Sequence, residues 1–200
     1  MPLFYLLVEG TLDEAVASEI IRAAGARPGT TLPKKGVNYI ENKIEDYNQL
    51  AQGIPILALV DLMDVNSDCP AEAVREWLPN RHEQMLLRFV VREIESWILA
   101  DRTSISRFLN VRKSKIPHNP EDLPDPKASL VDCARASPRE GLKYALVPDD
   151  PTVNSEGPAY TTRMERFVRN QWDLEVAMEY APSLRRCVRA VQDFLDEQSS

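Results

Sequence analysis

Short apolar runs separated by amphipathic segments mark the first half of the chain. Three largely apolar runs, at residues 3–8, 56–60 and 85–91, are bounded by polar or turn-forming residues. Runs of this length are typical of strands buried on both faces of a parallel sheet. Between them, apolar residues recur at helical spacing over residues 11–24 and 37–51. This alternation predicts an α/β fold with helices on both faces of the sheet.

Three further segments complete the predicted α/β region. Residues 30–34 predict a short strand, and Pro33 restricts it to the edge of the sheet because proline has no N–H to donate. Residues 70–78 predict a helix that begins with proline, and residues 92–101 have helical character. We therefore expect a small, four-stranded, mainly parallel, Rossmann-like sheet within residues 1–101.

The second half of the chain shows helical patterns without a clear strand pattern. Proline-rich sequence and a loop over residues 148–160 separate these patterns. Helices are expected at about residues 102–109, 126–136, 161–170 and 182–197. We interpret residues 102–200 as a helical C-terminal extension that packs on the α/β core.

Two of the apolar runs end abruptly in carboxylates. Glu9 follows the first run, and Asp61 and Asp64 follow the run at residues 56–60. Because parallel strands end at the same edge of a sheet, where α/β proteins bind ligands, these side chains should converge. Carboxylates held together repel one another unless a proton or a cation neutralises them. The pattern predicts a divalent-metal site for Mg²⁺ or Mn²⁺, which prefer oxygen ligands.

Asp13 lies four residues after Glu9, one turn into the predicted first helix. There it would either assist the metal site or interact favourably with the helix dipole. Both interpretations of Asp13 remain open from the sequence.

Lys127 is a candidate cation for a substrate phosphate.

Glu93 and Glu95 follow the last predicted strand and should return to the same sheet edge. On a helix, two residues at this spacing diverge by about 200°, so at most one would face the site if the helix begins at Arg92. On a strand end they would share a face. The alternative is surface pairing with Arg88 and Arg92.

Charge and cysteine content narrow the function classes. The net charge of −7 argues against a protein that coats nucleic acid non-specifically. Residues 88–143 nevertheless carry 11 basic and 8 acidic residues, against 7 and 13 in residues 1–87. This is either a basic surface or a set of solvated helix faces. The three cysteines are far apart without the paired spacing of a metal site, and neither histidine lies near a cysteine pair, so a Cys/His zinc site is not expected.

The first apolar run is too short for a membrane span and lacks the basic start of a signal peptide. We therefore expect a cytoplasmic protein that does not associate with a membrane. The sequence leaves the oligomeric state open.

The acidic motifs resemble the TOPRIM domain of topoisomerases, primases, recombination proteins and OLD-type nucleases. Val8-Glu9-Gly10 follows the first strand, and Asp61-Leu62-Met63-Asp64 follows the third. The spacing from Glu9 to Asp13 is similar to the OLD-type branch. Residues 92–101 look like a motif of bacterial TOPRIM-like proteins, some of which accompany an ATPase in phage-defence loci. One departure is that TOPRIM domains usually carry Asp-x-Asp, whereas two residues separate Asp61 and Asp64 here.

This resemblance implies a metal-dependent nuclease that hydrolyses DNA or RNA, as the effector of an anti-phage system with a possible ATPase partner. The metal ligands would be Glu9, Asp13, Asp61 and Asp64. The residues expected to take part in catalysis are Glu9, Asp61, Asp64, Glu93, Glu95 and Lys127. The alternative is a non-catalytic TOPRIM-like module that binds an ATPase or nucleic acid, which the altered acidic motif would allow.

Overall fold

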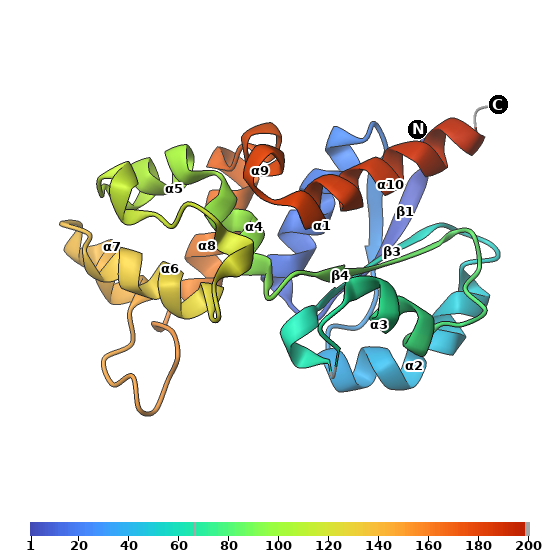
Figure 1. The fold of residues 1–200 in the computed structure, drawn as a ribbon, viewed down its shortest axis with the longest axis horizontal. Coiled ribbons are helices and arrows are strands. Elements are labelled where there is room, and N and C mark those ends of the chain that lie inside the picture. Colours follow the sequence, from blue (N-terminus) through green and yellow to red (C-terminus); the bar gives the residue numbers. More distant parts are fainter. Residues whose placement is uncertain (66, 199–200) are drawn as a thin grey trace. The chain divides into compact units, whose positions relative to one another are not determined.

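A computed structural model describes residues 1–65 and 67–198 and contains a four-stranded, all-parallel sheet within them (Figure 1). The strands, in chain order, are β1 (Leu3–Leu7), β2 (Arg27–Thr31), β3 (Ile56–Asp61) and β4 (Met85–Val90). Their spatial order is β2-β1-β3-β4, so β1 and β3 are the central strands. The predicted small, parallel, Rossmann-like sheet is confirmed.

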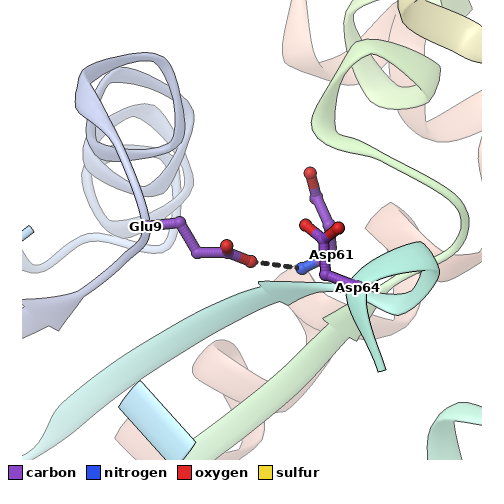
Figure 2. A group of neighbouring side chains, drawn as sticks. All are labelled: Glu9, Asp61 and Asp64. Carbon is purple, nitrogen blue, oxygen red and sulfur yellow. Dashed lines mark hydrogen bonds between the residues drawn. The ribbon is translucent and has the colours of Figure 1, made fainter. Parts of the chain in front are cut away.

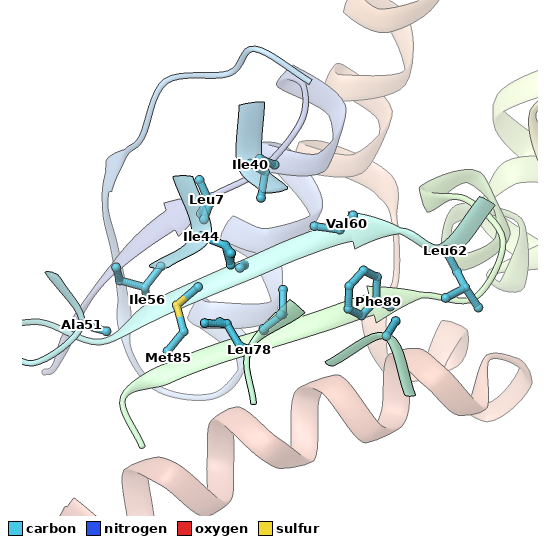
Figure 3. Packing of buried hydrophobic residues seen from close by; sticks show 13 residues of the cluster. Leu7, Ile40, Ile44, Ala51, Ile56, Val60, Leu62, Leu78, Met85 and Phe89 are labelled. Carbon is cyan, nitrogen blue, oxygen red and sulfur yellow. The ribbon is translucent and has the colours of Figure 1, made fainter. Parts of the chain in front are cut away.

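Helices cover both faces of the sheet. On one face, α2 (Val37–Leu50) and α3 (Pro70–Trp77) pack over β3 and β4. Ile40, Ile44 and Ala73 from these helices join a cluster of buried side chains from β1, β3 and β4 (Figure 3). The residues of β3 from Ile56 to Val60 are all at most 1% exposed, which explains why this run is continuously apolar.

The opposite face carries α1 (Thr11–Ala23) and α10 (Pro182–Gln198). The chain moves from β1 to β2 in one direction and from β2 to β3 in the other. Right-handed crossovers therefore place α1 and α2 on opposite faces. Phe4 of β1 contacts Phe194 of α10 in an edge-to-face arrangement, with ring centroids 5.6 Å apart, and this contact fixes α10 to the sheet.

The second strand lies at the edge of the sheet, as expected, but three residues earlier than predicted. It includes Pro28 and Gly29, a pair that otherwise favours a turn. An edge strand tolerates proline, and Pro28 pairs in register with Phe4. A Cβ on Gly29 would lie 2.9 Å from the Leu3 side chain, so glycine allows β2 to approach β1 closely.

The chain forms two compact units, one of Met1–Val91 with the C-terminal segment from Ser183, and one of Arg92–Pro182. The second unit is helical. Its α-helices are α4 (Ile94–Ala100), α5 (Arg102–Leu109), α6 (Pro126–Arg135), α7 (Glu140–Leu146), α8 (Tyr160–Gln171) and α9 (Leu174–Tyr180). The sequence analysis placed the boundary after residue 101. In the structure, α4 belongs to the helical unit, and α10 belongs to the unit that contains the sheet.

Two short helices, α7 and α9, were not expected from the sequence. Each has seven residues, which is too short for a clear helical period. Within the described part of the chain, no helix combines the length and apolar character that crossing a membrane requires.

Candidate metal centre

Three carboxylates meet at the carboxyl ends of the two central strands (Figure 2). One oxygen from each of Glu9, Asp61 and Asp64 lies within 4.8 Å of the other two. Leu7, the last residue of β1, pairs with Ala58, so the same register continued brings Glu9 level with Val60, next to Asp61 at the end of β3. The structure thus brings together the three acids that the apolar runs predicted at one sheet edge.

Local backbone geometry sets the direction of each side chain. Glu9 lies two residues after the end of β1, and its Oε1 accepts a hydrogen bond of 3.0 Å from the backbone N–H of Asp61. Asp61 is the last residue of β3, and a 3₁₀ turn over Leu62–Asp64 comes next. With three residues per turn, positions three apart lie on the same side, so Asp64 returns toward Asp61. The two-residue separation between the aspartates therefore does not prevent their convergence.

Burial makes the ionised form of Glu9 costly. The pKa of the Glu9 carboxyl is raised from 4.5 to about 7, mainly because burial desolvates the charged form and also because Asp13 and Asp64 are negatively charged. Hydrogen bonds from the backbone of Asp61 and Val37 act in the opposite direction. Near neutral pH, Glu9 therefore holds a proton for about half of the time unless a cation replaces it.

Asp13 has a different position from the three converging acids. Its Oδ2 accepts a hydrogen bond of 3.1 Å from the backbone N–H of Gly10, the N-cap residue of α1. Within the described residues, the acids whose oxygens meet within 4.8 Å are Glu9, Asp61 and Asp64, and Asp13 is not among them. It affects the site through its charge on Glu9.

A cavity of about 470 Å³ lies beside Asp64. Its walls include Trp77, and the titratable side chains that line it in the described part of the chain are Glu41, Asp64 and Glu76. All three are acidic. This surface repels a phosphate-bearing ligand unless cations are present.

Glu93, Glu95 and Lys127 lie in the helical unit, where they form a second charged group. The backbone N–H of Lys127 donates to Glu93 Oε2 at 2.9 Å. The ammonium Nζ of Lys127 lies 3.7 Å from Glu95 Oε1 and 3.6 Å from Glu156 Oε2. The Tyr160 hydroxyl donates to Glu95 Oε1 at 3.0 Å. The sequence did not predict that Tyr160 and Glu156 join this group, because both lie more than 60 residues after Glu95 and no motif links them to it.

Both glutamates reach Lys127 because α4 begins later than expected. Glu93 precedes the helix, with an extended backbone at φ −140° and ψ 162°. Glu95 lies in the first helical turn. The expectation that at most one of them faces a common site assumed a helix from Arg92, and the start at Ile94 removes that constraint.

Glu95 is an unusual carboxyl because it is 2% exposed. Its pKa is raised from 4.5 to about 7, mainly by burial and also by the negative charge of Glu93. The Lys127 ammonium and the Tyr160 hydroxyl stabilise the carboxylate and act in the opposite direction. A carboxyl with this pKa can hold or release a proton near neutral pH.

The resemblance to TOPRIM domains depends on the order and spacing of these acids on a parallel sheet. The fold and the convergence of the three carboxylates are compatible with it, but they are features that many α/β proteins share. No protein-family model, curated protein or solved structure matches the chain.

Proposed function

We propose that this protein is a divalent-metal-dependent nuclease of the TOPRIM type. The observation that supports the proposal is the meeting of Glu9, Asp61 and Asp64 at the ends of two central parallel strands. This edge is where open α/β sheets bind their ligands. A phosphodiester of DNA or RNA would be the substrate.

The donor set fits Mg²⁺ or Mn²⁺. Three carboxylates supply oxygen ligands, and the group contains neither cysteine nor histidine. The raised pKa of Glu9 shows that the group is costly to ionise without a counter-charge. A divalent cation would remove this cost by pairing with all three acids.

The chain's own residues would act mainly by positioning. The hydrogen bond from the Asp61 backbone holds the Glu9 carboxylate in place, and the 3₁₀ turn presents Asp64 at the exposed side of the group. A bound Mg²⁺ or Mn²⁺ would stabilise developing negative charge and lower the pKa of a water molecule. The sequence-based assignment of Lys127, with Glu93 and Glu95, to the substrate phosphate stays a prediction, because these three residues belong to the other compact unit.

The acidic cavity beside Asp64 supports a strict requirement for metal. Glu41 and Glu76 line it together with Asp64, so a phosphodiester would be repelled in the absence of a cation. From the resemblance we also propose a cytoplasmic role as effector of an anti-phage system, with an ATPase as possible partner.

Cleavage assays test the proposal. Plasmid DNA, single-stranded DNA and RNA would be incubated with Mg²⁺ or Mn²⁺, with and without the partner ATPase. Wild type should cleave, and Glu9→Gln, which keeps the hydrogen-bond acceptor but removes the charge, should lose cleavage. Glu45→Gln is the matched control, since Glu45 is exposed on α2 and lies outside both the group of three and the cavity beside it. Equal cleavage by wild type and Glu9→Gln, or none under any condition, contradicts the proposal.

Calorimetric titration with Mn²⁺ separates this function from a non-catalytic partner module. The nuclease proposal requires heat of binding that Asp61→Asn reduces. Absence of heat, or heat that Asp61→Asn leaves unchanged, favours the partner module.

A further inference from the structure

A second cavity, of about 180 Å³, lies at the edge strand β4 of the sheet-bearing unit. Side chains from α3 and α10 complete its walls. The residues that line it are Pro70, Ala71, Val74, Leu87, Arg88, Phe89, Ser183, Arg186 and Cys187. Among these residues of the described chain are two arginines and no carboxylate.

Neither arginine is neutralised by a neighbour. Across residues 1–65 and 67–198, the guanidinium groups of Arg88 and Arg186 have no hydrogen-bond or ion-pair partner. The Nε of Arg88 is also buried, and a buried N–H without an acceptor is costly. Arg88 further disfavours the charged form of Arg81, whose pKa is lowered by burial and then by this like charge. The cavity is therefore lined by two positive charges that no side chain of the described residues pairs.

The charge pattern of α10 adds to this excess. Its basic residues, Arg185, Arg186 and Arg189, lie in the N-terminal half, and its acidic residues, Asp193, Asp196 and Glu197, lie in the C-terminal half. This order is the reverse of the one that the helix dipole favours. An anion at the N-terminus of α10 would interact favourably with the dipole and with Arg186. A bound anion would therefore offset the unfavourable placement of the basic residues near the N-terminus of α10.

We propose that Arg88, Arg186 and the N-terminus of α10 form a binding site for a phosphate group. The volume supports a group rather than a whole cofactor, because small-molecule pockets usually measure about 300–1,000 Å³. It holds more than one water, since a single water needs only about 10–15 Å³ on this measure, and it leaves room for a tetrahedral oxyanion. Guanidinium groups bind such oxyanions through charge-assisted, often bidentate, hydrogen bonds.

The phosphate has two chemical sources, namely free inorganic phosphate or a phosphodiester of nucleic acid. This site uses none of the residues of the metal centre, so it is tested without metal and without cleavage. Binding of inorganic phosphate would be measured by calorimetry in EDTA. Binding of a fluorescent single-stranded oligonucleotide without terminal phosphate would be measured by anisotropy under the same conditions.

The variants are Arg88→Met and Arg186→Gln, with Arg185→Gln as the matched control. Arg185 lies in the same turn of α10 and is exposed, but it does not line the cavity. Loss of the charge-assisted hydrogen bonds from the guanidinium group to the phosphate should weaken binding about tenfold or more in both test variants. The control should change affinity by no more than about twofold, as expected for a screened surface charge.

Weakened binding of inorganic phosphate supports a free-phosphate site, and weakened binding of the oligonucleotide alone supports a phosphodiester site. The proposal is overturned if wild type binds neither ligand, or if Arg185→Gln weakens binding as much as Arg186→Gln. Circular dichroism would check that Arg88→Met is folded. If it is not, Arg186→Gln carries the test by itself, because Arg186 is exposed.

Discussion

The backbone N–H of Asp61 donates a hydrogen bond of 3.0 Å to Glu9 Oε1, and this bond joins residues 52 positions apart in the sequence. It links the ends of the two central strands, β1 and β3. The Glu9 carboxylate is therefore directed toward the two aspartates before any cation binds. Such prior orientation reduces the entropy that a ligand would otherwise have to offset.

Glu9→Gln should stabilise the metal-free protein at pH 8. The folded-state pKa of Glu9, about 7, is above its ordinary value of 4.5, so its stabilising protonated form is lost as pH rises through 7. The shift corresponds to at most roughly 3 kcal/mol, and solvent screening of this half-buried group reduces the effect. Urea unfolding in EDTA would measure it. The gain in free energy of unfolding from Glu9→Gln should shrink toward pH 5. Glu41→Gln, at an exposed position, is the control and should show no such trend. A gain from Glu9→Gln that does not change with pH would refute this assignment.

Mn²⁺ should bind more weakly as the pH is lowered, because the ion must displace the Glu9 proton. With a pKa of about 7, the apparent affinity should weaken about tenfold between pH 8 and pH 6. Calorimetry at the two pH values, in buffers of different ionisation enthalpy, would also detect proton release. Glu9→Gln should bind Mn²⁺ more weakly and without this pH dependence. An affinity that is the same at both pH values would exclude Glu9 as a ligand.

The sequence predicted the features that depend on strong burial. The runs that form β3 and β4 are apolar because both faces are covered, and parallel pairing of β1 with β3 then brings Glu9 to Asp61. The Pro28-Gly29 strand was not predictable, because its formation depends on an edge position and on the close approach of Leu3. These are properties of the assembled sheet rather than of the segment.

Contacts between residues far apart in the sequence could likewise not be predicted from it. The pattern of α10 predicts an amphipathic helix but does not identify the surface it covers, and the contact of Phe194 with Phe4 shows that it returns to the sheet. Tyr160 falls at the end of the loop predicted over residues 148–160. Its hydroxyl proves to be a hydrogen-bond donor to the buried Glu95 carboxyl.

Tyr160→Phe should destabilise the protein by about 1–3 kcal/mol at pH 8, because the buried Glu95 carboxylate loses a donor. The loss should be smaller near pH 5, where Glu95, with a pKa of about 7, is protonated. Urea unfolding at both pH values would measure the difference. Tyr144→Phe, at a position 64% exposed in the same unit, is the control and should have no measurable effect. Equal losses at pH 5 and pH 8 would show that the hydroxyl does not act through the Glu95 charge.

Gly157→Ala should be strongly destabilising. A Cβ at Gly157 would lie 2.6 Å from the Ala145 carbonyl oxygen, a distance that only a backbone shift can relieve. Gly157 also donates to the Leu146 carbonyl oxygen at 3.0 Å, so the segment that leads to α8 cannot move without losing this bond. Overpacking of this kind costs about 1–3 kcal/mol.

The matched control is Gly141→Ala in α7, where a Cβ would meet nothing within 4 Å. Alanine there should stabilise the helix by roughly 0.5–1 kcal/mol, because glycine loses more backbone entropy on folding. Urea unfolding followed by circular dichroism would compare the two variants. Opposite signs are expected from the same chemical change in one unit. Equal effects would mean that the backbone contact at Gly157 does not constrain the approach to α8, and hence the position of Tyr160 beside Glu95.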